Sequence, residues 1–225
     1  MRAPSLGQRP DLAAISALLA AHHLEVLGGF HCAGAEESLP KGTESLLLIG
    51  PKQPGFWPHV TQSPEWRDGA RDPLDRWSRK VIGRLACDLG GKALFPFGGP
   101  PWHPFHHWAL RSGRIWASPT GLLLHAEQGL WLSFRGALAL AWPLDLPPAA
   151  TQPCAACAKP CLSACPVGAL GAQDYNVPAC HDYLDQDPGQ ICLNTGCQTR
   201  GACPVSARHA RMVEQSSYHM RQFHS

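Results

Sequence analysis

The sequence predicts an α+β protein in two parts, a mixed α/β domain over residues 1–146 and a small cysteine-rich module over residues 147–225. Three observations lead to this prediction. Before Pro143, apolar runs of strand length and helical patterns occur in mixed order and without internal repeats. The composition then changes at PLDLPPAATQP, which is typical of a linker. Eight of the ten cysteines follow, between Cys154 and Cys203.

The first elements are predicted from periodicity and from turn residues. Asp11 precedes the apolar pattern LAAISALLAAHH, which favours a helix capped by that aspartate. LEVLGGF and SLLLIGP are short apolar runs interrupted by glycine and proline, and they predict two buried strands. Residues 51–72 are rich in proline and aromatic residues, so we expect an ordered loop there.

Two further elements complete the first domain. DPLDRWSRKVIGRLACDLGG opens on Asp72 and Pro73, closes on Gly90 and carries an apolar face, so it predicts the clearest helix of the chain. GLLLHAEQGLWLSFRGALALAW contains two runs of strand-forming residues around a polar turn at residues 126–129. This pattern predicts a β-hairpin.

The cysteine spacing indicates iron-sulfur chemistry. The chain reads Cys154-x2-Cys157-x3-Cys161-x3-Cys165-Pro166, one residue longer than the bacterial C-x2-C-x2-C-x3-C-P run. In proteins with two clusters, the cysteine before proline binds the other cluster. We therefore expect two crossed [4Fe-4S] clusters, with one four-ligand cluster as the minimum. The predicted ligand sets are Cys154, Cys157, Cys161 and Cys203 for one cluster and Cys165, Cys180, Cys192 and Cys197 for the other.

Two other uses of the cysteines stay open at this point. A disulfide framework would suit an oxidising compartment, but the sequence shows no clear secretory signal. A structural zinc site could use the CxxC pair and the nearby His181, but it needs only four ligands and would leave the other cysteines without a role.

Composition excludes several classes of protein. Charged residues make up 16% of the 225 residues and the formal net charge is +2, which is no signature of a nucleic-acid partner. No apolar run reaches the length of a membrane span. Neither a G-x-G-x-x-G fingerprint after a strand nor a P-loop occurs. We expect a cytoplasmic protein that binds neither membrane nor nucleic acid.

At the predicted hairpin the sequence resembles known families. LRSGRIWASPTGLLLHAEQGLWLSFRGALALAWPLDLPP, followed by the cysteine module, resembles the cobalamin-dependent epoxyqueuosine reductases. GLLLHAEQGLWLSFRG is also similar to the animal cobalamin-trafficking chaperone of the decyanating type. The resemblance implies a flavin-reductase-like, cobalamin-chaperone-like α/β domain that accommodates a corrinoid or a flavin. It also implies a ferredoxin-like module with a short C-terminal helix.

The sequence departs from the reductases at two points. Their catalytic aspartate falls near Pro101, whereas residues 89–144 contain no aspartate and Glu127 is their only acid. The reductases also carry a long C-terminal part that engages tRNA, and this sequence ends soon after Cys203. Reduction of a tRNA nucleoside is therefore not expected.

Several residues outside the cysteines are candidates for binding a cofactor. Histidine can ligate a metal or move protons near neutral pH, and tryptophan can line a cofactor cleft. For the histidines near Trp102 the alternative is packing against the domain core, and for Arg135 it is a structural ion pair. The candidate residues are His103, His106, His107, His125, Trp131 and Arg135.

The function predicted from these patterns is iron-sulfur electron transfer. The clusters would pass electrons to a corrinoid, a flavin or a small substrate held by the first domain, which would make the chain an oxidoreductase. The alternative is a ferredoxin-like electron carrier with no catalytic activity of its own. In either case the partner is a redox protein or a small-molecule acceptor.

Overall fold

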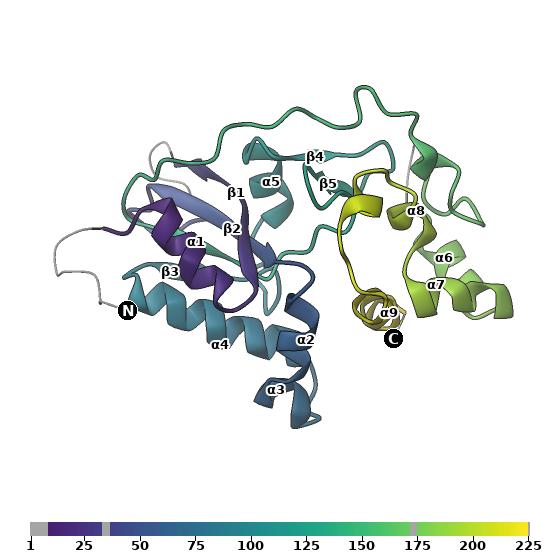
Figure 1. The fold of residues 1–225 in the computed structure, drawn as a ribbon, viewed down its shortest axis with the longest axis horizontal. Helices are drawn as coiled ribbons and strands as arrows, with labels where there is room; N and C mark the ends of the chain where they lie inside the picture. The colour runs from purple at the N-terminus through teal and green to yellow at the C-terminus, as the bar shows by residue number, and fades with distance from the viewer. Residues whose placement is uncertain (1–8, 33–36, 172–174, 225) are drawn as a thin grey trace. The chain divides into compact units, whose positions relative to one another are not determined.

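The computed structural model describes residues 9–32, 37–171 and 175–224 and forms two compact units. The first unit consists of Met1–Gly113 and Ser133–Ala149, and the second of Arg114–Leu132 and Ala150–Ser225. The predicted division at residue 146 followed the linear sequence, whereas here segment 114–132 groups with the cysteine-rich part. Figure 1 shows the elements of both units.

A four-stranded antiparallel sheet forms the centre of the first unit. Its strands follow the order β1 (Leu24–His31), β2 (Ser45–Pro51), β6 (Gly136–Leu140) and β3 (Lys92–Leu94). β2 and β6 are buried at every position, as expected of central strands that are apolar without alternation. The two strands predicted from LEVLGGF and SLLLIGP are confirmed as β1 and β2.

Three helices contact this sheet, and Figure 1 labels them. α1 (Leu12–Ala20) and α5 (Phe105–Arg111) contact β1, while α4 (Pro73–Asp88) contacts β3 and β6. The amphipathic pattern that predicted α4 is confirmed, because its apolar face is buried at Leu74, Trp77, Ile82 and Leu85. Within the part of the chain that the structure describes, no helix has both the length and the apolarity to cross a bilayer.

Residues 51–72, predicted as a loop, contain two short helices, α2 (Phe56–Thr61) and α3 (Pro64–Arg67). The prediction was wrong because it gave more weight to proline than to capping. Ser63 accepts a hydrogen bond from the backbone N–H of Trp66 at 3.3 Å, and Pro64 occupies the first turn, where proline is tolerated.

The hairpin predicted over residues 121–142 is also wrong. β5 (Leu123–His125) pairs with the earlier β4 (Ile115–Ala117), and β6 joins the other sheet. The polar turn does form, but it closes locally, because His125 and Gly129 exchange backbone hydrogen bonds of 3.0 Å. Leu130 and Trp131 then use their backbone for contacts within the second unit instead of extending the ladder.

The rest of the second unit consists of short helices and turns. Single-turn 3-10 helices occur at η1 (Pro160–Leu162), η2 (Asp187–Gly189) and η3 (Ser206–Arg208). The α-helices are α6 (Val177–Leu184), α7 (Gln190–Thr195), α8 (Gln198–Gly201) and the longer α9 (Val213–Phe223). α9 packs against α7. Elements this short are not stable alone, so their packing depends on shared contacts or on a bound group.

The cap of α1 gives a first testable prediction. The Asp11 carboxylate accepts a hydrogen bond of 2.8 Å from the backbone N–H of Ala14. Because the cap satisfies an N–H group that has no partner within the helix, Asp11→Ala is expected to lower the free energy of unfolding by about 1 kcal/mol. Urea unfolding followed by circular dichroism measures this change. Asp145→Ala, which alters an exposed aspartate of the same unit, is the control, and an equal loss in both variants would contradict the capping role.

Candidate functional site

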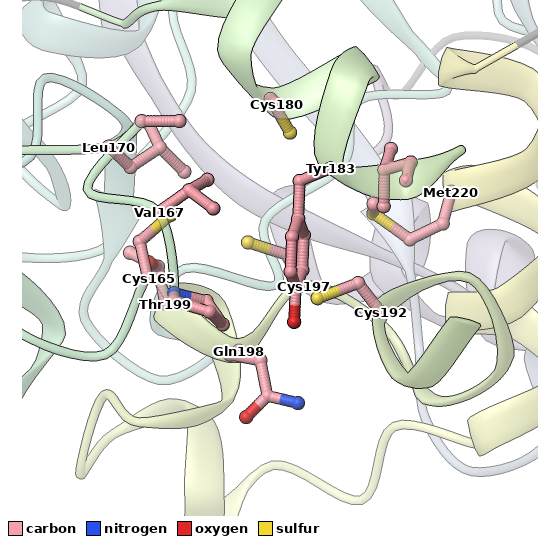
Figure 2. Close-up of a pocket in the computed structure, with 13 residues that line it drawn as sticks. Cys165, Val167, Leu170, Cys180, Tyr183, Cys192, Cys197, Gln198, Thr199 and Met220 are labelled. Atoms are coloured by element: carbon pink, nitrogen blue, oxygen red, sulfur yellow. The ribbon is translucent and has the colours of Figure 1, made fainter. Parts of the chain in front are cut away.

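Four cysteines from separate segments of the second unit line one pocket, and we call them the Cys180 group. α6 carries Cys180, α7 carries Cys192, and Cys197 is the N-cap residue of α8. Cys165, the cysteine before Pro166, completes the group from the turn that follows η1. Figure 2 shows the four around the pocket, with the sulfur atoms of Cys180 and Cys192 directed toward its middle.

The wall around the Cys180 group is apolar, formed by residues such as Val167, Leu170, Leu184 and Met220. The pocket has a free volume of about 20 Å³, which is room for about one water molecule. The segments that carry the cysteines are short helices and turns, whose local opening costs less free energy than opening a sheet.

The remaining four cysteines form a second set, Cys154, Cys157, Cys161 and Cys203, which we call the Cys154 group. Cys161 and Cys203 are buried in a cluster with Leu124, Leu130 and Val205, and Cys154 packs against that cluster. Cys154, Cys157 and Cys203 line an open pocket of about 340 Å³. This group combines the first three cysteines of the long motif with the last cysteine of the module.

The thiol pKa shifts follow the same division into two groups. Burial raises the pKa of Cys154 and Cys161, and the neighbouring Cys203 and Cys157 raise it further. Burial likewise raises the pKa of Cys180, with Cys197 and Cys165 adding to the effect. Thiols that lie this close would repel one another as thiolates, so each group needs a cationic centre before all four can ionise.

Hydrogen bonds to sulfur are present in both groups. The backbone N–H of Lys159 donates to Cys157 Sγ at 3.3 Å, and the backbone of Gln198 hydrogen-bonds Cys192. In the Cys180 group the Tyr175 hydroxyl also donates to Cys180 Sγ at 3.6 Å. Burial and this bond raise the pKa of Tyr175, so the hydroxyl keeps its proton and stays a donor.

The arrangement of the two cysteine groups bears on the two alternatives that the sequence left open, a disulfide framework and a structural zinc site. None of the ten cysteines forms a disulfide bond. Among residues 9–32, 37–171 and 175–224, no three histidine, cysteine or acidic side chains converge as ligands of a single metal ion. A cubane cluster differs from a single ion because each thiolate binds its own iron, which spaces the sulfur atoms more widely.

Segment 114–132 contacts the parts of the chain that carry two of the cysteines. The backbone N–H of Leu130 donates to Ser206 Oγ at 2.8 Å, and the Arg200 guanidinium donates to the carbonyl of Leu130. Arg211 donates to the carbonyl of Trp131 at 3.2 Å and lies over its ring. α8 and η3, which follow Cys197 and Cys203, are therefore both tied to this segment.

Sequence reasoning did not include Arg200, Ser206 or Arg211 among the candidate residues. For Arg200 a signal existed, because it stands midway between Cys197 and Cys203, where a compact motif would have a cysteine. The roles of Ser206 and Arg211 depend on contacts with residues about 80 positions away, which no local pattern reveals.

His125 lies in the second unit and is 3% exposed. Its Nδ1 accepts hydrogen bonds from the backbone N–H groups of Glu127 at 3.2 Å and Gln128 at 3.1 Å. A neutral imidazole that accepts at Nδ1 carries its proton on Nε2. In this geometry His125 closes the turn, and neither ring nitrogen presents a lone pair to a metal.

The other histidine candidates lie in the first unit. His103 stacks on Trp108, with 5.6 Å between the ring centroids, and lines a pocket of about 160 Å³ with Arg79, Phe97 and Trp102. This volume is below the range of about 300–1,000 Å³ typical of ligand pockets. His106 and His107 lie on α5 and are exposed.

Arg135 also belongs to the first unit. Its guanidinium forms an ion pair with Asp75 on α4, with 3.5 Å between Nη1 and Oδ1. Burial raises the pKa of Asp75 while Arg135 acts to lower it, as expected of a partly buried structural pair. This contact is the ion pair that the sequence left open as the alternative to cofactor binding.

No protein-family model and no curated protein matches this chain. One solved structure that matches is a selenomethionine-labelled epoxyqueuosine reductase, at 18% sequence identity and with a TM-score of 0.49. The match covers 79% of this chain and 52% of that chain, so this chain spans about half of that protein's length.

Proposed function

We propose that each cysteine group binds one [4Fe-4S] cluster and that the protein transfers electrons. A single observation carries this proposal. Eight cysteines spread over about 50 residues separate in space into two groups of four, and each group takes the cysteine before proline from the other half of the module. This exchange is typical of two-cluster ferredoxins.

The residues present fit such clusters. Each group supplies the four thiols that one cluster requires, together with hydrogen-bond donors to sulfur and an apolar surround. When bound, the clusters would supply one-electron transfer. The protein's own contribution is to hold the thiolates, limit the access of water and set the charge around each group.

The acceptor that we propose for these electrons is a corrinoid, a flavin or a small substrate bound by the first unit, which would make the protein an oxidoreductase. The pocket beside His103 supports only the small substrate among these acceptors, because its volume of about 160 Å³ is below that of typical ligand pockets, while it combines the Arg79 cation with the aromatic rings of Phe95, Phe97 and Trp102.

A specific observation favours the second candidate, a ferredoxin-like carrier. Glu127 is the only acid in residues 89–144, and it pairs with Arg114 at 2.6 Å, so this stretch offers no uncommitted carboxylate for proton transfer. Titration of the reconstituted protein with cobalamins, flavins and small aromatic acids, followed by absorbance, separates the candidates. If no ligand binds with a dissociation constant below about 100 μM, which corresponds to a binding free energy of about 5.5 kcal/mol, the carrier hypothesis replaces the enzyme hypothesis.

Metal content tests the proposal itself. The full chain, reconstituted without oxygen, is expected to hold about eight iron and eight sulfide and to show the low-temperature paramagnetic signals of reduced four-iron clusters. Cys87→Ser, which changes an exposed cysteine of α4, is the control and should keep the full content. A content of about four iron would reduce the proposal to one cluster, and a protein with zinc or without iron would overturn it.

A further inference from the structure

The Cys154 group lies beside an opening at the surface of the second unit. The pocket that contains Cys154, Cys157 and Cys203 has a free volume of about 340 Å³, and Ala156 and Pro204 in its lining are exposed. The pocket at the Cys180 group has a volume of only about 20 Å³. The open side of the Cys154 group thus leaves a partner room to approach the cluster that we propose there.

The lining of this open pocket is apolar except for one cation. Besides the cysteines it consists of leucine, valine, alanine and proline residues and of Arg208. A site for a small substrate has a few precisely placed polar groups that fix its orientation, and one exposed arginine does not provide them. Small contact areas and complementary charges are typical instead of the weak complexes that electron-transfer proteins form.

The segments that carry the Cys154 group are positively charged. Residues 151–171 hold three of its cysteines and residues 190–213 hold the fourth, and neither segment contains an aspartate or a glutamate. Lys159, whose backbone N–H donates to Cys157 Sγ at 3.3 Å, and Arg208 both have exposed side chains. In the part of the chain that the structure describes, neither side chain forms an ion pair with a carboxylate. Both charges are therefore available to a partner.

The segment that carries Cys180 has the opposite charge. Residues 175–189 contain Asp182, Asp185 and Asp187, which are all exposed, and neither lysine nor arginine. An acidic partner is attracted by the cations near the Cys154 group and repelled by these aspartates. Charge therefore favours both a docking place, the Cys154 group, and a sign of partner.

We propose that electrons enter at the Cys154 group, from a small redox protein with an acidic surface that docks over the open pocket beside Lys159 and Arg208. The inference rests on the proposed function. In this step the reduced partner loses one electron and the cluster of the Cys154 group gains it, so no bond breaks and no proton moves. Attraction between opposite charges raises the rate of encounter and makes that rate fall as salt is added.

The test is the reduction of the anaerobically reconstituted full chain by reduced flavodoxin, an acidic one-electron carrier, followed by stopped-flow absorbance. Lys159→Gln/Arg208→Gln is expected to lower the second-order rate constant about tenfold at low salt and to lose most of its salt dependence, and each single variant about threefold. Lys159→Arg/Arg208→Lys keeps both charges and should retain the rate. The control Arg221→Gln, which removes an exposed charge from α9, should also retain it.

Two further measurements separate docking from damage to the cluster. Reduced methyl viologen is a small cation, so the double glutamine variant should react with it faster than the wild type, because two repelling charges are gone. The dissociation constant of the flavodoxin complex, measured by calorimetry, should rise about tenfold in the same variant. Equal slowing with both reductants, or an unchanged dissociation constant, would overturn the role of these charges.

The wild type alone also decides the inference. A rate with flavodoxin that does not depend on salt, or an equal loss of rate in Arg221→Gln, would overturn it. So would wild-type dimers, seen by sedimentation, that the double glutamine variant abolishes, because a second copy of the chain would then cover this surface. A wild-type chain without iron would refute the proposed function, whereas two clusters reduced at a salt-independent rate would refute this inference alone.

Discussion

The double variant Cys154→Ala/Cys203→Ala is expected to lose about four iron, no more than either single variant loses. Both residues belong to the Cys154 group, although 48 intervening residues separate them in the sequence. Removing a second ligand from a cluster that is already lost costs nothing further. Iron and sulfide analysis after anaerobic reconstitution measures the effect.

The matched control is Cys161→Ala/Cys165→Ala, in which the two residues are close in sequence but belong to different groups. This variant is expected to lose about eight iron, because each cluster loses one ligand. The reverse result, with four iron retained in the Cys161/Cys165 variant and none in the Cys154/Cys203 variant, would contradict the crossed arrangement.

Gly129→Ala is expected to destabilise the second unit by about 3 kcal/mol and to release iron from the Cys154 group. Gly129 has a φ of +61°, which costs roughly 1–2 kcal/mol for a residue with a Cβ. The added Cβ would also lie against the backbone nitrogen of Ser206 and 2.9 Å from its Cα, and relieving such overpacking costs about 1–3 kcal/mol more. Because Ser206 follows Cys203 closely, the displaced segment is the one that carries this cysteine.

Gly121→Ala separates the two contributions to this effect. Gly121 has a φ of +77° but no atom within 4 Å of an added Cβ, so its cost is expected to be about 1–2 kcal/mol, with iron retained. Urea unfolding and iron content of the two variants give the comparison. Equal destabilisation, or full iron content in Gly129→Ala, would show that the packing of Gly129 on η3 is unimportant.

Local sequence patterns were sufficient to predict several helices and strands of the first unit. The apolar face of α4, the Asp11 cap of α1 and the apolar runs of β1 and β2 were all visible in the sequence. In each case the residues that define the element are neighbours along the chain or one helical turn apart. The burial that they need is also the burial that a sheet with a covering helix provides.

The pairing of β5 could not be predicted in this way. The run before the turn at residues 126–129 has two apolar partners in the sequence, β4 behind it and the run that leads to β6 ahead. Both satisfy the alternation of a strand. The choice between these two strand partners depends on Leu130. Its backbone N–H donates to Ser206 and its carbonyl accepts from Arg200. Both contacts form only when the cysteine-rich segment is folded.

The sequence by itself determined the number of thiols, their spacing and the two Cys-Pro pairs, because these are properties of the chain in linear order. The sequence predicted that Cys203 lies with Cys154 and Cys165 with Cys180 only by analogy with crossed two-cluster proteins, whereas the tertiary structure supplies the packing that brings these segments together. The tertiary structure also decided that the side chain of Arg200, a residue placed like a motif cysteine, donates to the carbonyl of Leu130. The physical reason is that four thiols from separate segments can bind one cluster only if those segments are held at the right distances. Packing contacts, such as the hydrogen bond between Leu130 and Ser206, fix those distances.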